Sequence, residues 1–269
     1  MLLAVDVGNT NVLIGLYEGA RLRAHWRLQT HKRRTVDEHK VLMEQLFNLE
    51  GVDRESIKHG ILACVVPPLQ DVMVELMADY VGLNPLVVGP GIKTGMAIKL
   101  DNPREVGADR VVNAVAAYEE AQGECIVVDF GTATTFDVIS GQGEYLGGAI
   151  APGLHISADA LYRNTAKLPR VPVMRPRRVV GRSTVESIQS GLVFGYVGLV
   201  DGILERTIKE MGFVECRVFA TGGLARLISG CSKYIHDVDD YLTLKGLQIL
   251  YEKNRRGGKP EGDTAEQTE

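Results

Sequence analysis

Runs of apolar residues, separated by short polar turns, divide the chain into strands and helices. Leu3–Val7 and Val12–Leu16 are apolar runs on either side of a polar turn, which predicts a β-hairpin. The same pattern returns near the middle of the chain, where Cys125–Asp129 and Phe136–Ile139 flank a turn rich in threonine. Two matching hairpins indicate a duplicated domain, although two short hairpins can also resemble each other by chance.

Between and after the hairpins, the spacing of apolar residues changes from that of strands to that of helices. Thr35 and Glu38 have the spacing of a capping box, which predicts a helix from this point to about Leu49. The remaining pattern predicts strands at residues 60–66, 85–88 and 217–220, and helical segments at 69–81, 108–121, 183–211 and 241–253. Strands that alternate with helices predict an α/β fold.

The length of 269 residues is comfortable for two domains. We assign residues 1–105 to an N-terminal domain and 106–253 to a C-terminal domain, and expect that the last helix packs back on the first domain. Residues 254–269 are polar and rich in Gly, Glu and Thr, so we expect a disordered tail there.

The composition indicates the class of protein and the partners it can be expected to have. Apolar residues make up 45% and charged residues 24%, with a net charge of −4, which is typical of a soluble globular protein and offers no sign of a nucleic-acid partner. The basic cluster at residues 170–182 has no aromatic residues among its arginines, so we interpret it as a solvated loop.

The chain shows no sign of a secretory or membrane segment. Asp6 interrupts the N-terminal apolar run, and the later run near 191–200 is shorter than the ~20 residues that a membrane span needs. The cysteines lie far apart without metal-ligand spacing, as expected for free thiols in a reducing compartment: Cys64, Cys125, Cys216 and Cys231. We therefore expect a cytoplasmic protein with no membrane partner.

The turn of the first hairpin has the composition of a phosphate-binding loop. Gly8 allows close approach of the backbone, and Asn9, Thr10 and Asn11 add short polar side chains. Asp6 would repel a phosphate unless a cation lay between them, so it suggests the Mg²⁺ that accompanies ATP. The alternative is that Asp6 and Asn9 only shape the turn.

The second hairpin repeats this chemistry. Asp129 precedes a turn that contains Thr132, Thr134 and Thr135. Two such loops that close on one nucleotide suit phosphoryl transfer, in which positioning and charge neutralisation do most of the work. Gly222 and Gly223, between a strand and a helix, would let the backbone lie against adenine or ribose, although they can also be an ordinary helix start.

Six segments, in the order in which they occur, resemble the motifs of the type III pantothenate kinases, a family of the actin and hexokinase superfamily. They are Asp6–Thr10, Asn102–Arg110, Asp129–Thr135, Gly147–Gly153, Thr221–Ala225 and Leu242–Leu247. The resemblance implies two duplicated actin-like (ribonuclease H-like) domains with mixed sheets, flanking helices and a nucleotide cleft between them. It also implies ATP-dependent phosphorylation of pantothenate to 4′-phosphopantothenate, the first step of coenzyme A biosynthesis, by a homodimer.

The resemblance also implies roles for particular residues. The expected ATP contacts are Asp6, Val7, Gly8, Asn9, Thr10, Asn11, Val12, Leu13 and Thr132, to which we add Gly222 and Gly223. The expected pantothenate contacts are Gly107, Ala108, Asp109, Arg110 and Thr184, with Asp109 as general base. Asp129 is similar to the family's ligand for a monovalent cation, K⁺ or NH₄⁺. Leu100 stands where the family commonly has a tyrosine that helps bind pantothenate, so the pocket is expected to differ there.

The residues alone leave simpler interpretations open for three of these positions. Asp109 lies in a predicted first helical turn, where an acid often only complements the helix dipole. Arg110 could form a fork with the pantothenate carboxylate or be an exposed helix arginine. Thr184 lies between Ser183 and Glu186, which have the spacing of a second capping box and are needed for helix entry anyway.

Two other functions remain possible from the sequence: a non-catalytic nucleotide-binding regulator on the same fold, or a kinase of another small alcohol. The segment Gly107–Arg110 argues against a regulator, because an ATP sensor has no need of a base on the alcohol side. Leu100 is the feature that favours another alcohol. ATP turnover that depends on pantothenate would separate the three hypotheses.

Overall fold

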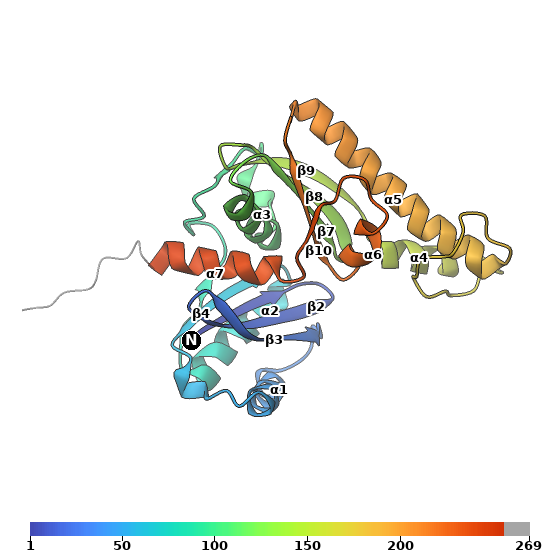
Figure 1. The fold of residues 1–269 in the computed structure, drawn as a ribbon. Helices are drawn as coiled ribbons and strands as arrows, with labels where there is room; N and C mark the ends of the chain where they lie inside the picture. The colour runs from blue at the N-terminus through green and yellow to red at the C-terminus, as the bar shows by residue number, and fades with distance from the viewer. Residues whose placement is uncertain (256–269) are drawn as a thin grey trace, which may run out of the picture.

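The computed structural model describes residues 1–255, which form two mixed β-sheets with helices on their faces (Figure 1). The first sheet contains β1 (Leu2–Val7), β2 (Asn11–Glu18), β3 (Arg21–Gln29), β4 (His59–Cys64) and β5 (Leu86–Val87). The second contains β6 (Ala97–Ile98), β7 (Cys125–Phe130), β8 (Ala133–Ile139), β9 (Glu144–Pro152), β10 (Arg217–Gly222) and β11 (Asp237–Val238).

The two sheets repeat one topology. The first has the order β3-β2-β1-β4-β5 and the second has the order β11-β10-β7-β8-β9-β6. In each sheet the central strand, β1 or β7, pairs antiparallel with the next strand in sequence and parallel with a strand that follows a helix. This repetition confirms the predicted duplication and the α/β class. β6, which precedes the boundary assigned at residue 105, pairs with β9 of the second sheet.

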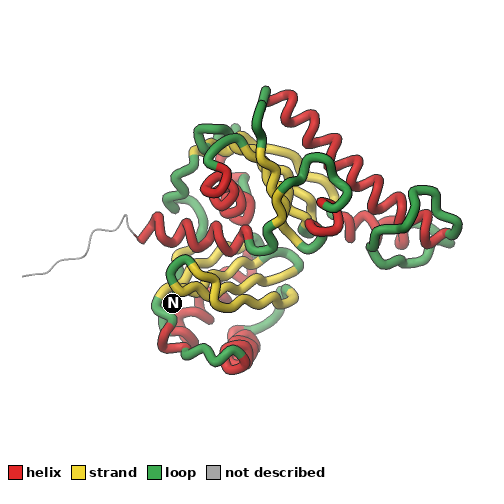
Figure 2. Tube along the Cα trace, in the orientation of Figure 1, coloured by secondary structure: helices red, strands yellow, loops and turns green. Residues whose placement is uncertain are grey.

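The helices cover the sheets and fill the space between them (Figure 2). They are α1 (Val36–Leu49), α2 (Pro67–Leu76) with a π-helical continuation (Met77–Val81), α3 (Ala108–Ala121), α4 (Leu154–Arg163), α5 (Thr184–Met211), α6 (Ala225–Ser229) and α7 (Leu242–Arg255). Short 3₁₀ turns lie at Arg54–Ser56 and Pro103–Glu105. α1 and α2 lie on one face of the first sheet, and α3 and α7 lie between the sheets (Figure 1).

Most predicted elements are found close to their expected positions. The capping box at α1 is complete, because the Glu38 N–H donates to Thr35 Oγ1 and the Thr35 N–H donates to the Glu38 carboxylate. The predicted start of the tail at residue 254 was wrong, because Asn254 and Arg255 belong to α7. The Asn254 side chain donates to the Leu250 and Lys93 carbonyls, and these bonds stabilise the end of the helix. The rest of the predicted tail, residues 256–269, lies outside the described residues.

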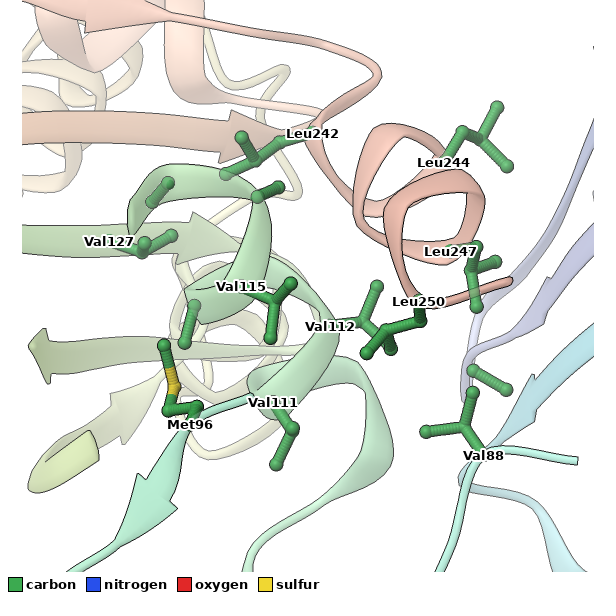
Figure 3. Packing of buried hydrophobic residues seen from close by; sticks show 14 of the residues in the cluster. Val88, Met96, Val111, Val112, Val115, Val127, Leu242, Leu244, Leu247 and Leu250 are labelled. Carbon is green, nitrogen blue, oxygen red and sulfur yellow. The ribbon is translucent and has the colours of Figure 1, made fainter. Parts of the chain in front are cut away.

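The packing of α3 against α7 forms a large part of the core. Val112 of α3 faces Leu247 and Leu250 of α7 (Figure 3). A Cβ at Gly246 would lie 2.1 Å from the Val112 carbonyl oxygen, so the close approach of the helices requires glycine there. α7 also contacts β1, β2 and β4 of the first sheet, so one helix links both halves of the molecule.

α5 is the one helix, among residues 1–255, that is long and apolar enough to cross a membrane by length and composition. It has 28 residues, and half of its most apolar window is buried. Tyr196, Val200 and Leu204 pack in the core of the second sheet. This is the pattern of a core helix in a globular protein.

Candidate functional site

Asp6 and Asp129 occupy equivalent places in the two sheets. Each is the penultimate residue of its central strand, β1 or β7, and each is followed by the turn of a hairpin. The Oγ1 atoms of Thr10 and Thr132, one from each turn, are 2.6 Å apart. The two predicted phosphate loops, separated by 122 residues in sequence, therefore meet in space.

The first loop is held by backbone contacts. The Gly8 N–H donates to the Asn11 carbonyl (3.0 Å), and Thr30 Oγ1 donates to the Gly8 carbonyl (2.7 Å). The Asn9 and Thr10 side chains are exposed and available to a ligand. Val7 and Val12 point into the core, and Leu13 packs against it, so a nucleotide could reach the two valines only through their backbone.

The glycine pair after β10 joins the same site. Gly222 has φ +91°, and a Cβ there would lie 2.6 Å from Asp129 Oδ1, so both the backbone conformation and the space require glycine. Gly223 is exposed, and a Cβ there would lie 3.9 Å from Arg27 Nη1. The positive charge of Arg27, in β3, lowers the pKa of Asp129 against the larger effect of burial. No local sequence motif marks Arg27.

Asp129 is anchored by a chain of side chains. Asn113 Nδ2 of α3 donates to Asp129 Oδ2 (3.3 Å), and Thr243 Oγ1 of α7 donates to Asn113 Oδ1 (2.8 Å). Asn113 is 1% exposed and Thr243 6% exposed, so the bond between them is buried, while the bond to Asp129 is partly buried. Burial, with smaller contributions from Asp109 and Asp137, raises the pKa of Asp129 to about 7. Sequence reasoning missed Asn113 and Thr243.

Asp6 is buried without such an anchor. It is 7% exposed, and its Oδ1 has no hydrogen-bond partner among residues 1–255. Burial, followed by the charges of Asp109 and Asp129, raises its pKa well above the ordinary value. A buried carboxylate without partners is costly, and a bound cation would compensate it. Residues 1–255 contain no group of three or more His, Cys, Asp or Glu side chains that could hold a metal by themselves, so an ion at Asp6 would need other ligands, such as phosphate oxygens and water.

Asp109 lies in the first turn of α3. Its Oδ1 accepts from the Arg110 N–H (2.8 Å), and a Cβ at Gly107 would lie 2.5 Å from the same oxygen. Burial raises the pKa of Asp109, against the opposing effect of Arg110. Because its charge also acts on Asp6 and Asp129, the structure places this carboxylate in the same group as the two hairpin aspartates.

Arg110 is not the exposed helix arginine that the sequence allowed. Its Nε donates to Asp137 Oδ1 (2.6 Å), and its Nη2 lies 3.4 Å from the Phe136 carbonyl oxygen. The side chain of Arg110 is 16% exposed, and that of Asp137 is fully buried. Tyr145 OH also donates to Asp137 Oδ1 (2.6 Å). The sequence analysis missed Asp137 and Tyr145, although a charged residue within the apolar run of β8 was a visible signal.

The other predicted substrate contacts fall into two places. Ala108 packs beside Asp109 at the start of α3, and half-buried Leu100 packs on the same core, close to Gly147.

Thr184 is exposed at the start of α5, where it lines an open cavity of about 740 Å³ together with Leu161 and Arg182. This end of α5 lies beside α4, away from α3 (Figure 1). Within one chain, the structure does not bring Thr184 to Asp109.

The cap of α5 is simpler than predicted. Ser183 Oγ accepts from the Glu186 N–H (3.2 Å), as in a capping box. The Glu186 carboxylate instead accepts from the Arg182 N–H (2.8 Å), so the reciprocal bond is made one residue earlier.

Comparison with known proteins finds relatives over nearly the whole chain. The family model described as type III pantothenate kinase matches residues 2–206. A type III pantothenate kinase of Anaeromyxobacter sp. (strain Fw109-5) is 58% identical over 255 residues, which cover 95% of this chain and 100% of the relative. That of Myxococcus xanthus (strain DK1622) is 55% identical over 254 residues, with 94% and 99% covered.

Two solved structures show the same fold at low sequence identity. A protein from Campylobacter jejuni assigned to the Baf family of transcriptional activators has a TM-score of 0.59 at 16% identity, covering 94% of this chain and 99% of its own. The ethanolamine utilization protein EutJ from Carboxydothermus hydrogenoformans has a TM-score of 0.54 at 15% identity, covering 92% and 89%. With the family match over most of the chain and relatives above 50% identity over nearly all of it, this chain belongs to the type III pantothenate kinase family.

Proposed function

We propose that the chain transfers the γ-phosphoryl group of ATP to pantothenate, giving ADP and 4′-phosphopantothenate, the first step of coenzyme A biosynthesis. Family membership supports the reaction. The observation that carries it is the meeting of the two hairpin turns at Thr10 and Thr132, with Asp109 in the same group of carboxylates as Asp6 and Asp129. Two phosphate loops beside a general base are the parts that phosphoryl transfer needs.

Asp109 is the base in this proposal. It accepts the proton of the primary alcohol of pantothenate as the alcohol attacks the γ-phosphorus atom. Burial raises its pKa, and a base whose pKa lies closer to the working pH transfers protons more effectively. The bond from the Arg110 N–H orients the carboxylate.

The remaining residues bind and orient. The backbone from Asp6 to Leu13, Thr132, Gly222 and Gly223 would hold the nucleotide, and Gly107, Ala108, Arg110 and Leu100 would contact pantothenate. Asp6 would hold hydrated Mg²⁺ through ATP, and Asp129 a monovalent cation, K⁺ or NH₄⁺. When bound, these cations neutralise charge on the phosphates. The unpaired Oδ1 of Asp6 supports a cation at this place.

We also propose that the enzyme is a homodimer. Large exposed apolar side chains gather between residues 150 and 185: Ile150, Ile156, Leu161, Tyr162, Met174, Val179, Val180 and Val185. Such a concentration is typical of an interaction surface. Thr184 lies within it, so a second copy would give Thr184 a route to the substrate that a single chain does not offer. Sedimentation of Val180→Glu against the wild type tests this: the variant is expected to be monomeric, and an unchanged dimer would overturn this surface.

We place the enzyme in the cytoplasm, without a nucleic-acid or membrane partner. The absence of a nucleic-acid partner is supported by the basic segment, where Arg170 pairs with Asp159 of α4 (2.8 Å), so that part of its charge is neutralised within the chain. The burial of half of the apolar window of α5 supports the absence of a membrane partner.

The test of the reaction is ADP release with ATP, Mg²⁺ and K⁺, with and without pantothenate. Turnover that requires pantothenate is the expected result. ATP binding without pantothenate-dependent turnover would favour the nucleotide-binding regulator. Turnover with another small alcohol would favour a different kinase, and Leu100→Tyr would then show whether the family's usual residue restores the use of pantothenate.

A further inference from the structure

Asp137 of β8 is a buried carboxylate that accepts hydrogen bonds on both oxygens. Its Oδ1 accepts from Arg110 Nε and from Tyr145 OH, each at 2.6 Å, and its Oδ2 accepts from Thr135 Oγ1 at 3.3 Å. Asp137 and Tyr145 are both 0% exposed. Three donors on a carboxylate that water does not reach hold it in one orientation.

Arg110, in contrast, has more N–H donors than the hydrogen bonds that its guanidinium makes. A guanidinium carries five N–H groups, and here Nε and Nη2 point at Asp137 and the Phe136 carbonyl. Throughout the described chain, Arg110 Nη1 makes no hydrogen bond, and the side chain is still 16% exposed. Asp137 is therefore held from several sides, while Arg110 can still bind a further acceptor next to the proposed base Asp109.

The first half of the molecule shows that the fold itself does not need an ion pair here. Asp137 pairs with Val127, two residues before Asp129, just as Gly15 pairs with Ala4, two residues before Asp6. At Gly15 the neighbour is Leu244, the third residue of α7, whose Cδ1 would lie 3.0 Å from a Cβ there. Arg110 is the third residue of α3. The same contact between helix and sheet is thus apolar in one half and charged in the other.

This arrangement requires a glycine at position 148, in β9. It lies opposite Asp137, and a Cβ at this position would lie 1.6 Å from the Phe136 carbonyl oxygen. That carbonyl is the acceptor of Arg110 Nη2. Any larger residue at position 148 would therefore move one of the two groups that orient the guanidinium.

We infer that Asp137, supported by Tyr145, is a positioning residue that fixes the guanidinium of Arg110 so that its Nη1 side binds the carboxylate of pantothenate. The inference rests on the proposed function. A guanidinium matches a carboxylate in shape and charge, and one already held in place loses less entropy on binding than a free side chain. Because the Arg110 guanidinium pairs with Asp137, it does not form an ion pair with the carboxylate of Asp109.

The test is the steady-state kinetics of Asp137→Asn, which removes the charge and keeps the size. We expect the KM for pantothenate to rise about tenfold or more, with a smaller change in kcat and no change in the KM for ATP. Tyr145→Phe removes one donor and keeps the ion pair, so its KM for pantothenate should rise by about two- to fivefold. A purely structural pair would instead lower the unfolding temperature and the active fraction, and leave both KM values unchanged.

A double-mutant cycle with Arg110→Gln separates action through Arg110 from any other effect. If Asp137 acts through Arg110, adding Asp137→Asn to Arg110→Gln changes the KM for pantothenate by less than twofold. An unchanged KM in Asp137→Asn, in an enzyme whose wild type turns over pantothenate, overturns the inference alone. Absence of pantothenate-dependent turnover in the wild type overturns the proposed function. If Asp137→Asn does not fold, Tyr145→Phe decides, and an unchanged KM in that variant counts against the inference.

Discussion

The aspartates in the central strands of the two sheets occupy the same place in a repeated fold, but their surroundings differ. Asp6 in β1 is 7% exposed and has an oxygen without a hydrogen-bond partner. Asp129 in β7 accepts from Asn113, which Thr243 holds in turn. Strand pairing thus decides where each carboxylate lies, and the neighbouring helices decide how firmly it is held.

The helices that contact the two sheets continue this asymmetry. α3 brings Asp109 and Arg110 to the second sheet, whereas α7 brings Leu244 to the equivalent place on the first. The second half therefore contains the proposed base and an anchored carboxylate, and the first half contains a loop and a carboxylate with one oxygen that has no hydrogen-bond partner within residues 1–255. The two halves share one backbone topology, and they differ in the side chains that this topology carries.

The largest effect should come from the base in the second half. In Asp109→Asn, the loss of a positioned base is expected to lower kcat by about 10²–10⁴-fold, with ATP binding retained. Pantothenate-dependent ADP release measures it. Asp71→Asn, an exposed acid on α2, is the matched control and should keep wild-type turnover. A loss of less than tenfold in Asp109→Asn would remove Asp109 from the role of base.

The pH dependence of stability separates Asp129 from the bulk of the carboxylates. With a pKa of about 7 in the folded chain and about 4 when unfolded, Asp129 binds its proton more tightly in the folded state. Its contribution to stability is therefore fully present below about pH 4 and is lost as the pH rises to about 7. Without cations, the unfolding temperature of the wild type should fall between pH 5 and pH 8 relative to that of Asp129→Asn. Parallel curves for the two proteins would contradict this.

Neutralising Asp6, whose Oδ1 has no hydrogen-bond partner within residues 1–255, should change the stability of the protein. Asp6→Asn removes a buried charge, so we expect the unliganded protein to gain about 1 kcal/mol, or about 2–4 °C in unfolding temperature. The same variant should lose the stabilisation that Mg²⁺ and ATP give the wild type in thermal unfolding. A lower unfolding temperature in Asp6→Asn would mean that the carboxylate has a partner that the structure does not contain.

The smallest effect concerns the anchor of Asp129. Thr243→Val removes the hydrogen bond to Asn113 with little change in shape, at a cost of about 0.5–1.5 kcal/mol. Calorimetric unfolding should show a fall of a few degrees, and titration of activity with K⁺ should show weaker cation dependence. Thr184→Val, at the exposed start of α5, is a control for stability and should not change it. Equal unfolding temperatures for Thr243→Val and the wild type would show that the anchor contributes nothing.

Much of the fold could be predicted because it depends on local signals. The hairpins follow from apolar runs around polar turns, and α1 begins at the capping box of Thr35 and Glu38. α3 and α5 appear where their periodicity placed them. β6 could not be predicted, because a strand of two residues owes its existence to pairing with β9.

The residues of the candidate site also divide into those that a local motif marks and those that no local motif marks. Asp6, Asp109 and Asp129 stand in motifs that can be recognised along the chain, because a turn or a helix start needs its glycines and acids at fixed spacing. Arg27, Asn113 and Asp137 stand in no such motif, since each acts on a residue from a different element.

By itself, the sequence determined the duplicated α/β framework and the family, and it located the two turns that we propose as phosphate loops. Strand and helix periodicities and glycine-dependent turns are properties of short segments, so they can be read from consecutive residues. The tertiary structure alone decided that Thr10 meets Thr132, that Asp6 lacks a partner, and that Arg110 is held by Asp137. These contacts join distant segments, and their strength depends on burial, which exists only once the chain has folded.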